Sequence, residues 1–253
     1  MNKIVEKMRK LFLLLVLVSL WGCSTRVDTT LFSPEEHFDY AHKLYEDEDY
    51  EAAVREFQSI MLQYPGSTVN DDAEYYLAMT YFDRDQYLLA VYEFSKLIRD
   101  IPTSKFVPDS QFKLAEAYYE LSPPYELDQS YTKKAIEEFQ AFIDFFPTDE
   151  KVEYAENKIS EMNTKLAHKD YNSGVIYEKM EYNTAAMKYF EKVADIYHDT
   201  EYAPLALYRK INIEVTRGEK ADALSDIALF ISRYPDDTNA AELKSLEENL
   251  LNQ

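Results

Sequence analysis

Apolar residues recur in one fixed frame along most of the chain. In each copy an alanine is followed by large apolar residues four and seven positions later and then by a further apolar residue, which proline follows in all copies but the fourth. The five copies are Ala53, Phe57, Ile60, Tyr64, Pro65; Ala90, Phe94, Leu97, Ile101, Pro102; Ala135, Phe139, Phe142, Phe146, Pro147; Ala186, Phe190, Val193, Tyr197, His198; and Ala223, Ile227, Phe230, Tyr234, Pro235. This spacing places the apolar side chains on one helical stripe, and proline ends a helix because it lacks an N–H donor. The pattern predicts five helices that each bury one face.

A second small residue precedes four of the alanines by twelve positions. These residues are Ala41, Ala78, Ala115 and Gly174, whereas the fifth copy has Ile211. Small residues allow two helices to cross closely. The combined pattern resembles the tetratricopeptide repeat over roughly residues 34–236, and that resemblance implies stacked helical hairpins, since one hairpin cannot bury its face alone. We therefore expect an all-α protein, an α-α superhelix of about five hairpins.

The stretch between the third and fourth copies predicts a long helix. Its apolar residues follow a 3-4-3-4 spacing at Val152, Ala155, Ile159, Met162 and Leu166. We expect Thr148 to cap this helix, with Asp149 and Glu150 in its first turn. A helix of about thirty residues would join repeats 3 and 4 and divide the array into two rigid halves. Within the third hairpin, Pro123 and Pro124 begin an enlarged loop over residues 121–132.

The amino-terminal segment has the features of a targeting signal. A basic stretch precedes a predominantly apolar run of ten residues, 11–20, which would span only about half of a bilayer core as a helix. Leu20, Trp21, Gly22 and Cys23 resemble a bacterial lipobox, which implies cleavage before Cys23 and acylation of this sole cysteine. Ser24 is compatible with sorting to the outer membrane. The alternative is an ordinary secretory signal with a coincidental cysteine.

These features predict four segments. Residues 1–22 are a cleaved signal peptide, and residues 23–33 are the lipidated cysteine and a tether. Residues 34–147 hold repeats 1–3. Residues 148–253 hold the long helix, repeats 4–5 and a C-terminal capping helix. The folded body is expected to face the periplasm while the acyl lipid on Cys23 anchors it to the membrane.

The amino-acid composition agrees with a helical fold and limits the classes of partner that the protein is expected to bind. The chain has only 4 glycines and 9 prolines in 253 residues, which disfavours sheets and long loops. Its net charge is −20, and residues 23–253 alone carry 23 basic and 46 acidic side chains, a net charge of −23. Such a body repels phosphate backbones, so no nucleic-acid partner is expected. Solubility alone would also explain the charge.

Recognisable catalytic chemistry is missing from the sequence. The four histidines, His37, His42, His168 and His198, are dispersed and form no metal-binding motif. There is no glycine-rich phosphate loop and no nucleophile elbow. We expect neither an enzyme nor a metal site, and no cofactor besides the lipid.

Six aromatic residues in the first three repeats are candidates for a peptide groove. The first helices of tetratricopeptide hairpins line a concave groove, to which the fifth and twelfth positions of the repeat contribute. Those positions hold Phe38, Tyr45, Tyr75, Phe82, Phe112 and Tyr119. Exposed aromatic clusters mark interaction sites. Alternatively these rings pack against the next hairpin, and the sequence leaves both readings open.

A different set of residues predicts partner docking in the second half. It consists of Tyr202, Leu205, Tyr208, Arg209, Lys210 and Arg217, and it brings basic side chains into an otherwise acidic chain. Arg209 could pair with a carboxylate of the partner. A solvated basic face on a degenerate last repeat is the alternative.

Lipobox, tether, five repeats, long helix and length together resemble the BamD family of lipoproteins, which belong to the machine that folds β-barrels into the outer membrane. The similarity is closest over residues 167–200 and in the segment YYELSPPYELDQ at 118–129. The resemblance implies a non-catalytic scaffold whose amino-terminal repeats receive unfolded outer-membrane proteins. It also implies that the carboxy-terminal repeats dock on the periplasmic domains of the barrel-forming subunit. The alternative is an adaptor lipoprotein for cell-wall synthesis or envelope maintenance.

Overall fold

The computed structural model describes residues 28–252, and within them the chain forms helices and no strand. The elements are α2 (Pro34–Glu46), α3 (Tyr50–Gln63), α4 (Asn70–Asp83), α5 (Tyr87–Asp100), α6 (Val107–Glu120), α7 (Ser130–Phe145), α8 (Val152–Lys179), α9 (Asn183–Ile196), α10 (Tyr202–Arg217), α11 (Lys220–Arg233) and α12 (Ala240–Leu251). The predicted signal peptide and Cys23 lie outside the described residues.

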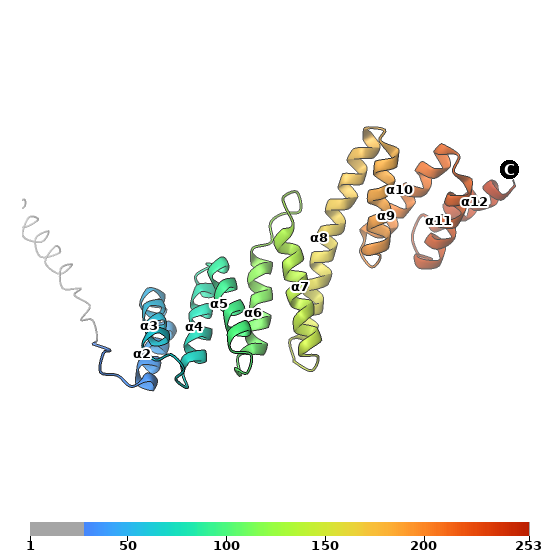
Figure 1. Ribbon diagram of the computed structural model, residues 1–253. Coiled ribbons are helices and arrows are strands. Elements are labelled where there is room, and N and C mark those ends of the chain that lie inside the picture. Colours follow the sequence, from blue (N-terminus) through green and yellow to red (C-terminus); the bar gives the residue numbers. More distant parts are fainter. Residues whose placement is uncertain (1–27, 253) are drawn as a thin grey trace, which may run out of the picture.

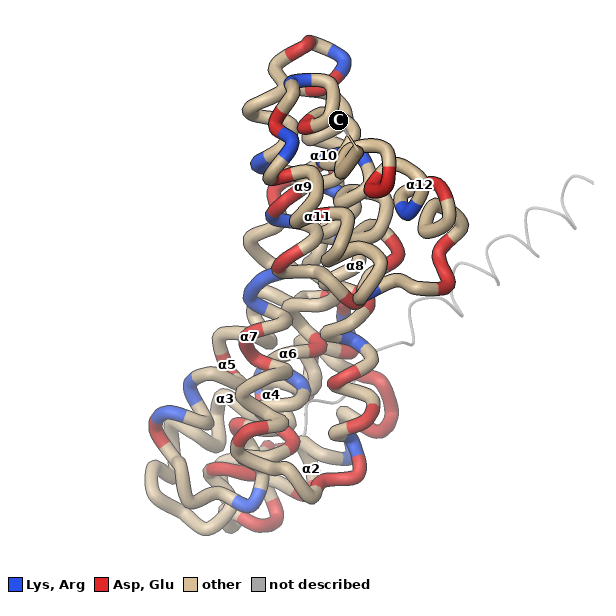
Figure 2. Tube along the Cα trace, turned by 90° about the vertical axis from the view of Figure 1, so that its right-hand side faces the viewer, with Lys and Arg blue, Asp and Glu red and all other residues tan. Residues whose placement is uncertain are grey.

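Successive helices stand side by side in an elongated stack that runs from α2 at one end to α12 at the other (Figure 1). The five hairpins are α2–α3, α4–α5, α6–α7, α8–α9 and α10–α11, and α12 packs on α11. Acidic residues occur along the whole stack with basic residues among them (Figure 2). The predicted all-α superhelix of five hairpins is confirmed.

The repeat frame forms the core of every hairpin. Its first large apolar residue is 0% exposed in all five copies, at Phe57, Phe94, Phe139, Phe190 and Ile227. The frame alanines and the small residues Ala41, Ala78 and Ala115 are equally buried. Burial of this apolar surface is the main stabilising contribution, and it joins each hairpin to the next.

Four hairpins turn through a residue in the left-handed backbone region. These residues are Glu48, Asp85, Glu181 and Gly218, with φ between 57° and 76°. In the first turn the Glu48 amide donates to the Tyr45 carbonyl and the next amide, of Asp49, donates to Leu44. This arrangement ends the helix and reverses the chain within a few residues. Only glycine adopts it without strain, so each of the three acidic residues costs on the order of 1 kcal/mol.

The third hairpin has its enlarged loop fastened to α8. Lys165 Nζ donates to Ser122 Oγ at 2.8 Å, and Lys169 Nζ donates to the Leu127 carbonyl at 2.6 Å. The Tyr125 ring lies 3.9 Å from the His168 ring, which stacks at 4.7 Å on Tyr202 of α10. A three-ring column therefore connects the loop of repeat 3, the long helix and repeat 5.

The long helix α8 contains 28 residues and belongs to both halves of the array. Its first part, with Ala155 and Met162, packs in the core of repeat 3, and its second part, with Leu166, packs against α9. The predicted cap at Thr148 is wrong. The Asp149 amide donates to the Phe146 carbonyl in a turn, and the helix begins only at Val152. Residues 146–151 form the turn between α7 and α8, so Thr148 lies in this turn and not at the start of the helix.

Candidate binding surfaces

Tyr76 is the centre of an aromatic cluster on the first two repeats. Its ring lies 5.8 Å from Phe38, 5.5 Å from Tyr45 and 5.3 Å from Tyr75, measured between ring centroids. His42 meets the same ring edge-on at 4.5 Å. The structure thus brings together three of the predicted groove residues through one that the sequence analysis missed. The adjacent tyrosines 75 and 76 were the available signal, because two neighbouring helical residues can both border a groove.

Two of these tyrosines also have contacts that hold them in place. Tyr45 Oη donates to Asp83 Oδ2 at 2.5 Å, and Tyr75 stacks on Phe106 with a centroid distance of 4.3 Å. Burial and then the hydrogen bond to Asp83 raise the pKa of Tyr45, while burial and then Asp109 raise that of Tyr75. Both phenols therefore stay uncharged at neutral pH. The single hydroxyl hydrogen of Tyr45 is donated to Asp83, so Tyr75 is the one of the two that can donate to a carbonyl of a bound peptide.

Phe82 and Tyr119 pack on lysines of the next first helix. Lys113 Nζ lies 4.7 Å from the Phe82 ring centroid, and Lys158 Nζ lies 4.0 Å from that of Tyr119. Tyr119 Oη also donates to Glu161 Oε1 at 2.6 Å. Cation–π contacts of this kind contribute about 0.5–1 kcal/mol each at exposed sites. Both rings help to fix the angle between successive hairpins while remaining partly exposed.

Phe112 does not line an exposed groove, and this part of the prediction is wrong. The residue is 6% exposed, and its ring is enclosed by Phe139, Phe142 and Tyr154. Tyr154 comes from the first turn of the long helix α8. Tyr154 itself is 45% exposed, so the exposed aromatic ring at this site is that of Tyr154 and not that of Phe112.

In the second half, four of the six predicted docking residues lie near one another. Arg209 Nε donates to Tyr171 Oη at 2.9 Å and Nη1 donates to Glu178 Oε2 at 2.7 Å. These three residues border a surface pocket of about 370 Å³ together with Leu205, Tyr208, Asn212 and Asn239. Tyr202 stands beside the pocket, 5.6 Å from Tyr171, and Leu205 is 41% exposed. Further N–H groups of the guanidinium remain for a partner's carboxylate.

Lys210 and Arg217 lie elsewhere. Lys210 Nζ is 2.6 Å from Asp226 Oδ2 and 3.1 Å from Glu214 Oε1, with only 15% of its side chain exposed. Its predicted place on an exposed docking face is therefore wrong. Arg217 borders a different pocket and donates from Nη1 to Thr184 Oγ1 at 3.4 Å.

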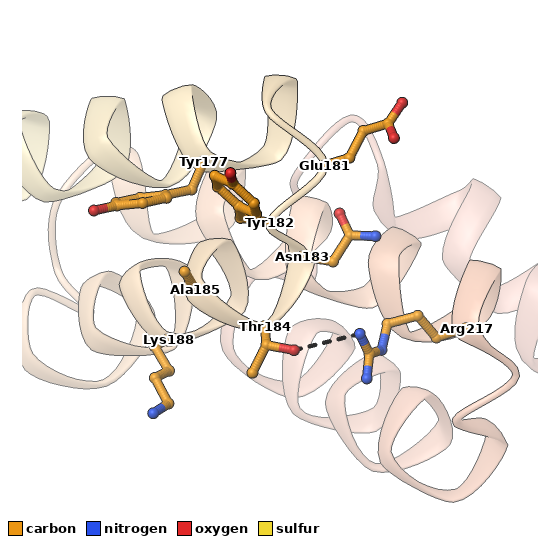
Figure 3. Close-up of a pocket in the computed structure, with 8 residues that line it drawn as sticks. All are labelled: Tyr177, Glu181, Tyr182, Asn183, Thr184, Ala185, Lys188 and Arg217. Atoms are coloured by element: carbon orange, nitrogen blue, oxygen red, sulfur yellow. Dashed lines mark hydrogen bonds between the residues drawn. The ribbon is translucent and has the colours of Figure 1, made fainter.

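The pocket at Arg217, which we call the turn pocket, lies at the α8–α9 turn and has about 530 Å³ (Figure 3). The rings of Tyr177 and Tyr182 stand on its α8 side, with centroids 6.5 Å apart, and Lys188 and Arg217 lie across from them. Two aromatic faces in one pocket suit an apolar side chain of a bound segment. The sequence analysis had singled out Arg217 but missed the two tyrosines.

Neither a metal site nor a membrane span occurs in the part of the chain that the structure describes. Among residues 28–252, no three His, Cys, Asp or Glu side chains lie together in a way that could hold a metal ion. Over the same residues, no helix combines the length and the apolar character needed to cross a bilayer.

Comparison with protein families shows to which family the chain belongs. The family model described as YfiO, outer membrane lipoprotein, matches residues 32–229. The chain belongs to this family. The match begins just before α2 and ends within α11, so it includes the aromatic cluster around Tyr76 and every residue lining the Arg209 pocket except Asn239.

A named relative agrees with this assignment. Outer membrane protein assembly factor BamD of Rickettsia prowazekii (strain Madrid E) is 28% identical over 225 residues, which cover 88% of this chain and 90% of that protein. The resemblance to the BamD family that the sequence indicated is confirmed.

Solved structures of tetratricopeptide proteins are also similar at low sequence identity. The thermophilic tetratricopeptide protein TTC0263 of Thermus thermophilus is 16% identical with a TM-score of 0.37, covering 87% of this chain and all of that one. The TPR2AB domain of yeast Sti1 is 14% identical with a TM-score of 0.40, covering 86% of this chain and 98% of that one.

Proposed function

We propose that this protein is the non-catalytic scaffold lipoprotein of an outer-membrane β-barrel assembly complex. In this proposal repeats 1–3 receive unfolded outer-membrane proteins, and repeats 4–5 dock on the periplasmic domains of the barrel-forming subunit. Acyl lipid on Cys23 holds the protein to the outer membrane, with the repeats in the periplasm. The name of the Rickettsia relative, an outer membrane protein assembly factor, supports the general role.

The observation that carries the substrate half of the proposal is the aromatic cluster around Tyr76. Phe38, Tyr45 and Tyr75 surround this ring, and all four are partly exposed. Uncharged phenols beside aromatic faces suit an extended segment that ends in an aromatic residue, because such a segment offers both a ring and unpaired backbone carbonyls. Five of the six predicted groove residues keep partial exposure while packing on the next repeat.

The docking half rests on the pocket at Arg209. Arg209 is held by Tyr171 and Glu178 of α8, so its guanidinium is oriented before a partner arrives. Leu205 and Tyr208 add apolar surface beside the charge. Arginine and tyrosine are among the residues enriched at the centres of protein interfaces, where most charged side chains are depleted. Since α8 also packs in repeat 3, the two surfaces belong to one stack.

Affinity purification tests the proposal. The tagged, lipidated protein is isolated from membranes solubilised in mild detergent, and the proteins that accompany it are identified by mass spectrometry. We expect a large outer-membrane β-barrel protein in near-stoichiometric amount. Recovery of cell-wall enzymes without that barrel would overturn the assembly role and favour the adaptor alternative. A Cys23→Ala variant, which cannot carry the lipid, serves as the control for membrane attachment.

A further inference from the structure

The fifth repeat has charged residues in a layer that is apolar in other repeats. Glu214 follows Ile211 by three residues, and the corresponding positions in repeats 1–4 hold Leu44, Tyr81, Tyr118 and Tyr177. Lys210 precedes Ile211 by one, where repeats 2 and 3 have the buried Leu77 and Leu114. At these two positions the fifth hairpin therefore has charged side chains where other repeats have apolar or aromatic ones.

Glu214 is buried without full compensation. Its side chain is 3% exposed, and Oε1 lies 3.1 Å from Lys210 Nζ. Oε2 has no hydrogen-bond partner. Lys210 is shared with Asp226, whose Oδ2 is closer at 2.6 Å. One ammonium thus faces two carboxylates, and a buried carboxylate oxygen without a donor is costly.

Glu214 borders a surface pocket of about 340 Å³ between α9, α10 and α11, which we call the acidic pocket. Its charged lining consists of Lys188, Glu191, Lys210, Glu214, Glu219, Asp222 and Asp226. Five carboxylates against two lysines leave an excess of negative charge. In the described residues no group of side chains has the arrangement of a metal site, so an organic cation is the fitting ligand.

The acidic pocket adjoins the turn pocket, and this points to a polypeptide ligand. Thr184 and Lys188 line both pockets. Arg217 borders the turn pocket and Glu219 the acidic one, and the two are paired at 2.7 Å. The two pockets therefore offer aromatic rings on one side of Thr184 and carboxylates on the other. A free small amine would contact only the carboxylates of the acidic pocket and not the aromatic rings of the turn pocket.

We propose that the acidic pocket binds the guanidinium or ammonium of a basic side chain from a partner polypeptide, whose neighbouring apolar residue lies against Tyr177 and Tyr182. The incoming cation supplies the donor that Glu214 Oε2 lacks and neutralises the excess charge. The site is on the edge of repeats 4 and 5, apart from the Arg209 pocket, and it does not depend on the assembly role.

Protonation of Glu214 gives this binding a pH dependence. Burial, then the charge of Asp226, raises the pKa of Glu214 to about 7 in spite of Lys210. The other charged groups that line the pocket are Lys188 and Glu191 of α9, Glu219, and Asp222 of α11. A cation favours the ionised carboxylate, so its affinity should rise between about pH 6 and pH 8, with uptake of the cation releasing a proton.

Calorimetric titration of the full-length lipidated protein in detergent tests the site. The probes are N-acetyl-arginine amide, its uncharged isostere N-acetyl-citrulline amide, and N-acetyl-tyrosyl-arginine amide. We expect the arginine probe to bind about tenfold more tightly than the citrulline probe, and the tyrosyl-arginine probe more tightly still. Glu214→Gln and the exposed Asp222→Asn should each weaken arginine binding several-fold. Glu201→Gln, which changes an exposed carboxylate just before α10 and outside the pocket, should not.

Equal binding of the arginine and citrulline probes would overturn the cation site. So would arginine binding that neither Glu214→Gln nor Asp222→Asn weakens. If the tyrosyl-arginine probe binds no better than the arginine probe, the polypeptide part of the proposal is overturned. Because these probes need no assembly partner, failure here is distinct from failure of the proposed function.

Discussion

His37 Nε2 lies 2.7 Å from Glu56 Oε2 in the first hairpin, and the histidine is 0% exposed. The pair belongs to a series. Glu56, Glu93 and Glu138 each follow a frame alanine by three residues, and Gln111 contacts Glu138 at 2.8 Å as His37 contacts Glu56. Repeats 1 and 3 therefore have such a polar contact between their two helices beside the apolar frame, and in repeat 2 Lys96 of α5 contacts Glu74 of α4 at 3.0 Å instead. The paired groups restrict how the helices can slide.

Loss of the Glu56 carboxylate should destabilise the first hairpin. Glu56→Ala leaves a fully buried imidazole nitrogen without its partner, which costs about 1–3 kcal/mol. Glu56→Gln keeps a hydrogen-bonding oxygen and should cost less. Urea unfolding followed by circular dichroism measures the difference, with the exposed Asp39→Ala as control. Equal midpoints for Glu56→Ala and Asp39→Ala would contradict the importance of the contact.

Gly174 should resist substitution although it lies inside a helix. A Cβ at this position would lie 2.5 Å from Cε1 of Phe190, so Gly174→Ala must displace a ring that is 0% exposed. Overpacking of about 1–3 kcal/mol should outweigh the helix-propensity gain of about 1 kcal/mol. Thermal unfolding should show a lower melting temperature for Gly174→Ala but not for the neighbouring Ser173→Ala. Restoration in Gly174→Ala with Phe190→Leu would identify the ring as the cause.

The sequence was sufficient to predict the packing within each hairpin. The core around Ala53 and Phe57 could be predicted because side-chain size and helical spacing decide such packing locally. Phe112 occupies the same repeat position as Phe38, but its burial depends on Tyr154 from the long helix, a contact that the repeat pattern does not contain. The role of Tyr76 similarly depends on how two hairpins meet.

Lys210 was misplaced for a different reason. It follows Tyr208 by two residues, and two residues turn a helix by about 200°, so the two side chains face nearly opposite sides. Grouping residues 202–217 as one docking face ignored this rotation. The repeat frame contained the correcting signal, because Lys210 occupies the position of the buried Leu77 and Leu114 in repeats 2 and 3.

Replacement of Tyr76 should weaken substrate binding. Tyr76→Leu removes the ring that Phe38, Tyr45 and Tyr75 contact but keeps an apolar side chain. We expect at least about fivefold weaker binding of a peptide that ends in an aromatic residue, measured by fluorescence anisotropy. Tyr92→Leu changes a tyrosine that is 62% exposed on α5 and should leave the affinity unchanged. Equal affinities for both variants would locate the peptide elsewhere.

Glu178 should compete with the docking partner for Arg209. Arg209→Ala is expected to reduce binding of the barrel-forming subunit's periplasmic domains about tenfold or more, because it removes the oriented guanidinium. Glu178→Gln should strengthen that binding, since a partner's carboxylate then replaces a weaker neutral acceptor. The pair is partly exposed, so neither change should alter stability by more than about 1 kcal/mol. Surface plasmon resonance measures both, with Lys179→Ala as control; weaker binding by Glu178→Gln would contradict competition.

Glu214 should make stability depend on pH. Because its pKa is about 7 in the folded protein and 4.5 for a free side chain, the folded state holds the proton more tightly. Stability from this group is present below about pH 4.5 and is lost as the pH rises through 7, by at most roughly 3 kcal/mol. Glu214→Gln should therefore be more stable than the parent chain at pH 8 and similar near pH 5. A constant difference across this range, measured by urea unfolding, would contradict the pKa.

The 28 residues of α8 also work as a spacer with a defined phase. Each residue adds about 1.5 Å and 100° of rotation, so the helix sets both the separation and the relative heading of the Tyr76 and Arg209 surfaces. Removing one residue from the middle of α8 would rotate one surface by about a quarter turn relative to the other. Removing seven residues from this helix would shorten the span by about 10 Å and nearly restore the relative direction of the two surfaces. The relative position of two partners bound to these surfaces therefore depends on the length of α8. Related proteins that bind the same pair of partners can change that length only in whole helical turns.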